Sequence, residues 1–245
     1  MKIAAIDAAF FYGYFNNRTF EVKMKIFLDT ADLGEIEKWL KTGILDGITT
    51  NPSLVKKKNP IPIWKKIIEA IRAYSKEPIS LSVEVFGDTP GAMLRQADYF
   101  IRVLNYSGLA IKIPILGVDG TDRLGVVHKL SDSGITVNCT ACVDWHQAFW
   151  AAKAGAKYVS LLYRRIIDMG SDGLATIKKT RKELDDCNLK SEIIAGSIRE
   201  ARDVFDVYEA GVHIVTVPPK FMPKIIYQKK SVETQEQFLR DAGML

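Results

Sequence analysis

The chain has 245 residues, of which 47% are hydrophobic and 26% are charged, and its formal net charge is +5 at pH 7. This balance excludes a disordered chain and suits a protein with a full core, as one large α/β domain or two small ones. The positive charge lies partly in local runs such as VKKKNP and IIYQKK, which are typical of solvated faces and attract anionic small molecules. Because no basic stripe is interleaved with aromatic residues, nucleic acid is not an expected partner.

The first 23 residues differ in character from the rest. The run AAIDAAFFYGYF is apolar, but it is short, it is interrupted by Asp7 and no convincing cleavage site follows it. We therefore expect neither an export signal nor a membrane partner. The chain begins again at Met24 with MKIFLDT, which is typical of a first β-strand. We expect residues 1–23 to be an N-terminal extension of uncertain status, which is an upstream mistranslation, an extra structural arm or a family-specific extension. Residues 24–245 are expected to form the folded domain.

From Met24 onward, short β-branched or apolar runs alternate with longer amphipathic stretches, which predicts parallel strands joined by helices. We expect eight strands, at residues 25–29, 46–50, 80–86, 109–114, 134–139, 157–162, 192–197 and 213–218. Their mean separation of about 27 residues is close to the roughly 30 of a βα unit, which favours a single (β/α)8 TIM barrel. The alternative, a doubly wound sheet, is disfavoured because no strand is followed by a GxGxxG or GxxxxGK[ST] loop.

The three cysteines, Cys139, Cys142 and Cys187, are too few and too irregularly spaced for a disulfide framework. The CTAC run lacks the second ligand pair of a zinc site, and the three histidines show no HExxH or HxH spacing. We therefore predict core thiols, a cytoplasmic protein and catalysis without a metal.

Polar residues stand at the expected C-terminal ends of the strands, which in a barrel face the active-site mouth. They are Asp29, Thr50, Asn51, Glu84, Lys112, Asn138, Thr140, Ser160 and Ser197. Glu84 and Lys112 each alternate with branched apolar residues, so both are expected to point into the barrel. A buried pair of this kind adds little net stability, because desolvation offsets the attraction, and we therefore favour a catalytic role.

Two of these residues have a competing structural explanation. Asp29 could cap the next helix, but Asp32 with Glu35 forms a better capping box, which leaves Asp29 for function. Asn51 precedes Pro52, and an asparagine followed by a proline is a favoured start of a helix. Helix capping and a functional role are therefore equally good explanations of Asn51.

Arginines follow the sixth and seventh strands, where barrels often bind phosphate. The Arg165 and Arg199 guanidinium groups and the Ser197 hydroxyl are expected to converge as an anion site. A phosphorylated substrate follows from this expectation.

The motifs LDTAD, GITTNPSLV, SVEVF, IKIP, ITVNCTA, YVSLLYRRIID and AGSIR occur in this order between Met24 and Leu245. In these motifs the chain resembles the short transaldolase and fructose-6-phosphate aldolase family. The resemblance implies a cofactor-free class I (β/α)8 enzyme of carbohydrate metabolism that acts on sugar phosphates. It also implies a homo-oligomer, with a decamer as one form, held partly by the C-terminal helix. The segment SVETQEQFLRDAGML is expected to form this amphipathic helix, which either packs on a neighbouring subunit or closes the barrel.

The resemblance also implies roles for the candidate residues. Lys112 would be the Schiff-base nucleophile on the C2 carbonyl of a ketose phosphate, a role that needs the neutral amine favoured by a barrel interior. Asp29 would exchange the proton of the C4 hydroxyl, and Glu84 would handle the imine proton transfers through a water held with Thr140. The hydroxyls of the dihydroxyacetone unit and the distal phosphate would bind to Asn51, Asn138, Ser160, Arg165, Ser197 and Arg199.

Within this resemblance, Glu84, Asn138 and Ser160 favour a transaldolase over an aldolase, which looks to carry Gln in place of Glu84 and to lack the asparagine. Leu161 and Leu162 stand where a proline and an aromatic residue are usual, which leaves the exact sugar open. The alternatives are an aldolase that releases free dihydroxyacetone or acts on another anionic ketose, and a non-catalytic barrel that binds sugar phosphates.

Overall fold

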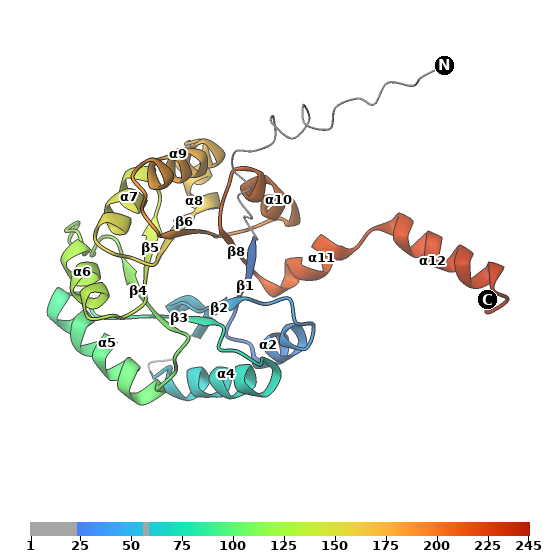
Figure 1. Ribbon diagram of the computed structural model, residues 1–245, viewed down its shortest axis with the longest axis horizontal. Coiled ribbons are helices and arrows are strands. Elements are labelled where there is room, and N and C mark those ends of the chain that lie inside the picture. The colour runs from blue at the N-terminus through green and yellow to red at the C-terminus, as the bar shows by residue number, and fades with distance from the viewer. Residues whose placement is uncertain (1–23, 56–58) are drawn as a thin grey trace, which may run out of the picture.

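The computed structural model describes residues 24–55 and 59–245. Its eight strands are parallel and close into a barrel in the order β1 to β8, with β1 hydrogen-bonded to β8. Helices cover the outside of the barrel (Figure 1). This arrangement confirms the predicted (β/α)8 fold. Residues 1–23 lie outside the described residues, so what was predicted for the extension stays a prediction.

The strands agree with the predicted positions except at their ends. They are β1 Lys25–Asp29, β2 Gly47–Thr49, β3 Ser80–Glu84, β4 Leu109–Pro114, β5 Val137–Cys142, β6 Tyr158–Leu162, β7 Glu192–Gly196 and β8 Ile214–Val217. The largest difference is at β5, which was expected at 134–139. Gly134 has a φ of 78° and belongs to the turn that precedes the strand, so the strand starts later than its sequence pattern indicates.

The helices up to α10 lie between the strands in sequence, and the last two follow β8. They are α2 Leu33–Leu40, α3 Pro52–Val55, α4 Ile61–Tyr74, α5 Pro90–Leu104, α6 Leu124–Asp132, α7 Trp145–Lys153, α8 Tyr163–Asp168, α9 Gly173–Asp186, α10 Ala201–Glu209, α11 Met222–Ile226 and α12 Lys229–Asp241, with a 3-10 turn η1 at Pro219–Phe221. Asp32 accepts a hydrogen bond from the Glu35 amide at 3.0 Å, so it caps α2 as predicted. Helix α4 buries one face, including Trp64, Ile67 and Ile71, against the barrel.

An apolar layer of side chains fills the interior of the barrel, on the side away from the C-terminal ends of the strands. Its buried members come from five strands and are Phe27, Ala110, Tyr158, Ile194 and Ile214. The Phe27 ring lies across β2 at Gly47, where a Cβ would approach it to 2.6 Å, so glycine provides the space for the ring. Because side chains alternate along a strand, the residue two positions further on each strand also points inward, above this layer.

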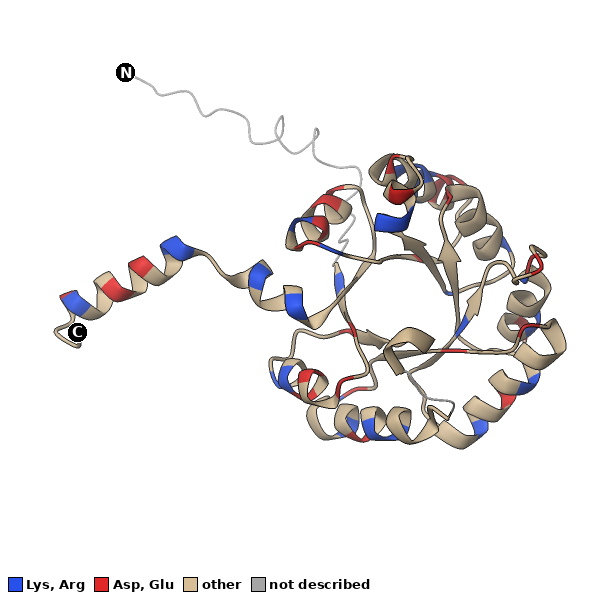
Figure 2. Ribbon diagram, turned by 180° about the vertical axis from the view of Figure 1, so that it is seen from behind, with Lys and Arg blue, Asp and Glu red and all other residues tan. Residues whose placement is uncertain are grey.

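Helix α12 projects away from the barrel (Figures 1 and 2), and no residue of it is buried. The helix therefore does not close the barrel, because it has no apolar contact with the strands to hold it there. Packing on a neighbouring subunit, the other expectation for this segment, stays a prediction. Its exposed apolar side chains include Val232 and Phe238.

The remaining predictions concern thiols and surfaces. Cys139 and Cys142 are buried, but Cys187 is exposed at the end of α9, so the expected core position is wrong for this residue. Among residues 24–55 and 59–245, no group of three or more His, Cys, Asp or Glu side chains is arranged to hold a metal ion. No helix within the same ranges is both long and apolar enough to cross a bilayer.

Candidate active site

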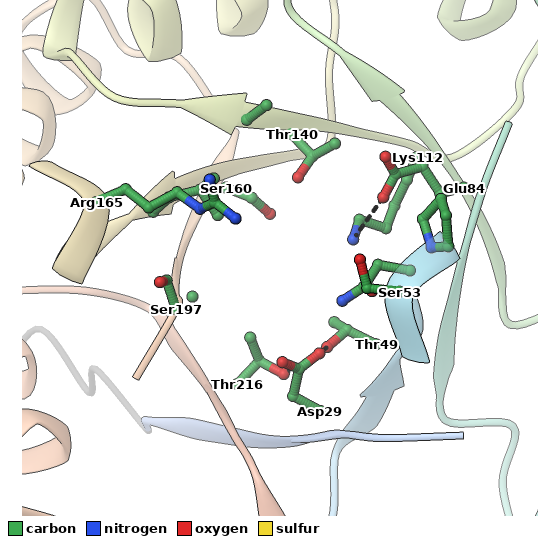
Figure 3. Close-up of a pocket in the computed structure, with 15 residues that line it drawn as sticks. Asp29, Thr49, Ser53, Glu84, Lys112, Thr140, Ser160, Arg165, Ser197 and Thr216 are labelled. Carbon is green, nitrogen blue, oxygen red and sulfur yellow. Dashed lines mark hydrogen bonds and ion pairs between the residues drawn. The ribbon is translucent and has the colours of Figure 1, made fainter. Parts of the chain in front are cut away.

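A cavity of about 500 Å³ opens at the C-terminal ends of the strands, above the apolar layer (Figure 3). It is lined by Asp29, Thr49, Asn51, Pro52, Ser53, Glu84, Lys112, Thr140, Ala141, Ser160, Leu162, Arg165, Gly196, Ser197 and Thr216. Asp29, Lys112 and Ser160 each follow a member of the apolar layer by two residues, so strand alternation alone turns them into the cavity. Eight of the ten predicted site residues line this cavity, and Asn138 and Arg199 do not.

Lys112 and Glu84 form the central ion pair of the cavity. They are register partners on β4 and β3, and the Lys112 Nζ lies 3.1 Å from the Glu84 Oε2. Lys112 is 6% exposed, and its ammonium also donates to the carbonyl oxygen of Thr50 at 3.1 Å. The prediction that both side chains point into the barrel is confirmed. The pair is an amine beside a proton acceptor in an enclosed cavity, which is the arrangement that a lysine nucleophile requires.

Asp29 lies at the end of β1 on another side of the cavity (Figure 3). Its carboxylate accepts a hydrogen bond from the Thr49 hydroxyl, with Oγ1 2.7 Å from Oδ1. Burial raises the pKa of Asp29, and the Thr49 hydrogen bond and the positive charge of Lys112 oppose that rise. A carboxyl with a raised pKa in a cavity is suited to accept and return a proton.

The ends of β5 and β6 supply hydroxyl groups. Ser160 lines the cavity and donates to the Asn138 Oδ1 at 2.7 Å, and the Asn138 Nδ2 donates to Ser82 at 3.1 Å. Asn138 is fully buried behind Ser160, so it acts on the cavity through that hydroxyl. Beside it, Ala141 has a φ of 60°, and the pairing of β5 with β6 shifts register there. Thr140 lies two residues after Asn138, in regular register with β4, and also lines the cavity.

The predicted anion site is only partly assembled. Arg165 and Ser197 line the cavity, at a distance from Lys112 and Glu84 in Figure 3. Arg199 is instead paired with Asp168 at the surface, with a 2.8 Å hydrogen bond from its Nη1 to Oδ1. Both side chains of this ion pair are about half exposed. The expected convergence of Arg199 with the other two groups is therefore not seen in this state of the protein.

Asp203 holds the loop that carries Ser197 by accepting hydrogen bonds from its backbone amides. This carboxylate is 1% exposed and accepts the Arg199 and Glu200 amides at 2.9 and 3.0 Å. It also accepts the Arg164 Nε at 2.8 Å, so that Arg164 faces the loop and its neighbour Arg165 faces the cavity. Ser197 itself has a φ of 61°, a left-handed conformation that the surrounding loop must maintain.

Replacing Asp203 with alanine is expected to lower the free energy of unfolding by about 3 kcal/mol, because it leaves the Arg164 charge and two amides without their buried partner. Urea denaturation measures this loss. The matched control is Asp206→Ala on the same helix, which removes an ion pair at 3.4 Å to the exposed Arg202 and is expected to cost less than about 1 kcal/mol. Equal losses in the two variants would contradict the role given to Asp203.

The sequence analysis did not predict three polar side chains that line the cavity, Thr49, Ser53 and Thr216. It chose Thr50 on the second strand, but Thr50 faces outward, where its hydroxyl accepts from the Trp64 indole at 3.0 Å. Alternation could have found Thr216, because it is the polar member of an apolar strand and lies two residues beyond Ile214.

Comparisons with known proteins give the family of the chain. The family model described as transaldolase/fructose-6-phosphate aldolase matches residues 26–243. A "Probable transaldolase 2" of Listeria monocytogenes is 35% identical over 218 residues, which cover 89% of this chain and 95% of that protein. A "Probable transaldolase" of a Chelativorans species is 37% identical over 220 residues, which cover 89% of this chain and 96% of that protein.

Among solved structures, thiamine phosphate pyrophosphorylase from Pyrococcus furiosus superposes with a TM-score of 0.55 at 14% sequence identity. The match covers 80% of this chain and 86% of that chain. At this identity the likeness shows the barrel fold alone. The family model and the relatives each extend over most of the chain, and the chain therefore belongs to the transaldolase/fructose-6-phosphate aldolase family.

Proposed function

We propose that this protein is a transaldolase, which moves a dihydroxyacetone unit from a ketose phosphate, fructose 6-phosphate or sedoheptulose 7-phosphate, to an aldose phosphate. The observation that carries the proposal is the buried Lys112–Glu84 pair, which shares one cavity with Asp29. A lysine, a carboxylate beside it and a second acid are the groups that Schiff-base cleavage of a carbon–carbon bond requires.

The first stage joins the donor sugar to Lys112. Glu84, 3.1 Å from the Lys112 Nζ, takes a proton from the ammonium and leaves a neutral amine, which attacks the C2 carbonyl carbon. The C2 oxygen then departs as water with protons returned through Glu84, and an iminium remains. We assign to Thr140 the task of holding, with Glu84, the water through which these protons pass.

The second stage breaks and remakes the carbon–carbon bond. Asp29 removes the proton of the C4 hydroxyl, the C3–C4 bond breaks, and its electron pair passes into the iminium to form an enamine. The aldehyde product leaves. C3 of the enamine then attacks the aldehyde carbon of the acceptor, the new hydroxyl takes its proton from Asp29, and hydrolysis releases Lys112 and the product ketose.

The remaining cavity residues would bind the sugar. We assign the hydroxyls of the dihydroxyacetone unit to Asn51 and Ser160, which line the cavity, with Asn138 orienting Ser160. We assign the distal phosphate to Arg165 and Ser197. For Arg199 to join them it must leave Asp168, to which its guanidinium donates two hydrogen bonds at the surface.

The test is a coupled assay of glyceraldehyde 3-phosphate released from fructose 6-phosphate, with and without erythrose 4-phosphate. We expect release only when the acceptor is present, because the proposed intermediate on Lys112 is discharged by an aldehyde and not by water. Release without the acceptor would identify an aldolase. No release of glyceraldehyde 3-phosphate in either assay, together with measured binding of a sugar phosphate, would support the non-catalytic alternative.

A further inference from the structure

Thr216 lies on the last strand of the barrel, where the sequence reading placed no functional residue. It is 5% exposed, lines the cavity, and points inward above Ile214 of the apolar layer. Its hydroxyl oxygen lies 2.6 Å from that of Thr49, a residue of β2 that is 3% exposed. Figure 3 shows Thr216, Thr49 and Asp29 gathered at one edge of the cavity.

The direction of these hydrogen bonds follows from counting protons. A threonine hydroxyl has a single proton, and an ionised carboxylate can only accept. Since the Thr49 hydroxyl donates to the Asp29 Oδ1 at 2.7 Å, its proton is already used when Asp29 is ionised. The short contact between the two threonines must then be a donation from Thr216 to Thr49. The chain of donors runs from Thr216 through Thr49 to the carboxylate.

Such a chain does more than satisfy two buried hydroxyls. A donor that itself accepts a hydrogen bond is polarised and binds a carboxylate more strongly, and hydrogen bonds to a charged group are about twice as strong as neutral ones. The chain engages Oδ1 and so fixes the rotation of the carboxylate. We assign proton transfer with the substrate to the other oxygen, Oδ2. The Thr49 hydrogen bond also opposes the burial that raises the pKa of Asp29.

We propose that Thr216 is a positioning residue for Asp29, which acts through Thr49 to hold the carboxylate oriented and ionised for proton transfer. The inference rests on the proposed function, because it needs Asp29 as the acid/base group. Thr216 touches no reacting atom in this scheme, and its effect passes entirely through the two hydrogen bonds.

The test compares Thr216→Val, which keeps the shape of the side chain and removes the hydroxyl, with Thr216→Ser, which keeps the hydroxyl. We expect kcat to fall about tenfold in the valine variant, as for the loss of one charge-assisted hydrogen bond, and to stay within about twofold in the serine variant. The acidic limb of the pH profile of kcat should move to higher pH in the valine variant, because Asp29 loses support for its ionised form. Thr216→Ala provides the same loss of the hydroxyl if valine disturbs packing.

Borohydride trapping of the fructose 6-phosphate adduct separates this inference from the proposed function. Adduct formation needs Lys112 and Glu84, so the valine variant should trap as much adduct as the wild type while it turns over more slowly. An unchanged kcat and pH profile in Thr216→Val, or equal losses in the valine and serine variants, overturns the inference alone. Failure of the wild type to form any adduct overturns the proposed function and this inference with it.

Discussion

Replacing Lys112 with methionine is expected to abolish turnover, with a loss of at least about a thousandfold in kcat, because no other residue among the described lining of the cavity carries an amine that can form the imine. The same variant should give no borohydride-trapped adduct with fructose 6-phosphate. Methionine has nearly the length of the lysine stem, so the space beside Glu84 stays filled. Turnover is measured with the coupled assay, and the adduct is measured by intact-protein mass.

The control for this variant is Lys153→Met, which removes an exposed lysine at the end of α7. It should keep wild-type activity. Because Glu84 loses its partner in Lys112→Met, urea denaturation of this variant and of the double variant with Glu84→Gln checks that an unpaired charge has not unfolded the protein. A well-folded Lys112→Met enzyme that retains more than about a hundredth of the wild-type rate would contradict the Schiff-base proposal.

Replacing Asp29 with asparagine is expected to lower turnover by about a hundredfold to ten-thousandfold, the range for loss of a general acid/base. Adduct formation should persist, since this step does not use Asp29. Borohydride trapping and the coupled assay together locate the defect after imine formation. Loss of the adduct as well would contradict the assignment of imine formation to Glu84 and of carbon–carbon bond cleavage to Asp29.

The same substitution is expected to raise stability at neutral pH. Burial raises the folded-state pKa of Asp29 above its ordinary value of 3.8, so as pH rises past that value the unfolded chain loses its proton first and the folded state loses stability. Asparagine carries no such cost. The gain should be small near pH 4 and larger at pH 7.5 in urea denaturation, and a gain that does not increase with pH would contradict the raised pKa.

The sequence alone predicted the barrel and the polar side chains at its centre. Strand alternation is a local property with a period of two, so the inward direction of Glu84 and Lys112 follows from their apolar neighbours without any knowledge of the rest of the chain. The polar residues at the C-terminal ends of the strands could be identified from the sequence for the same reason. The resemblance in the motifs around these residues named the family that the comparisons show.

The alternation pattern fails where the backbone departs from regular geometry. At β5, Ala141 is left-handed and the pairing with β6 shifts register between Cys139 and Cys142, and the strand runs to Cys142, past its expected end at residue 139. On β2 the reading was off by one residue, which exchanged the inward Thr49 for the outward Thr50. A shift of one residue moves a side chain to the opposite face, so small errors in strand position change the set of site residues.

Which polar groups meet was decided only by the tertiary structure. Thr49 and Thr216 are 167 residues apart and touch because β1, between β2 and β8, closes the barrel. Arg199 follows its strand as predicted, yet its guanidinium lies against Asp168 rather than in the cavity. No local pattern contains either contact, because each depends on how strands and helices far apart in sequence are brought together when the sheet closes.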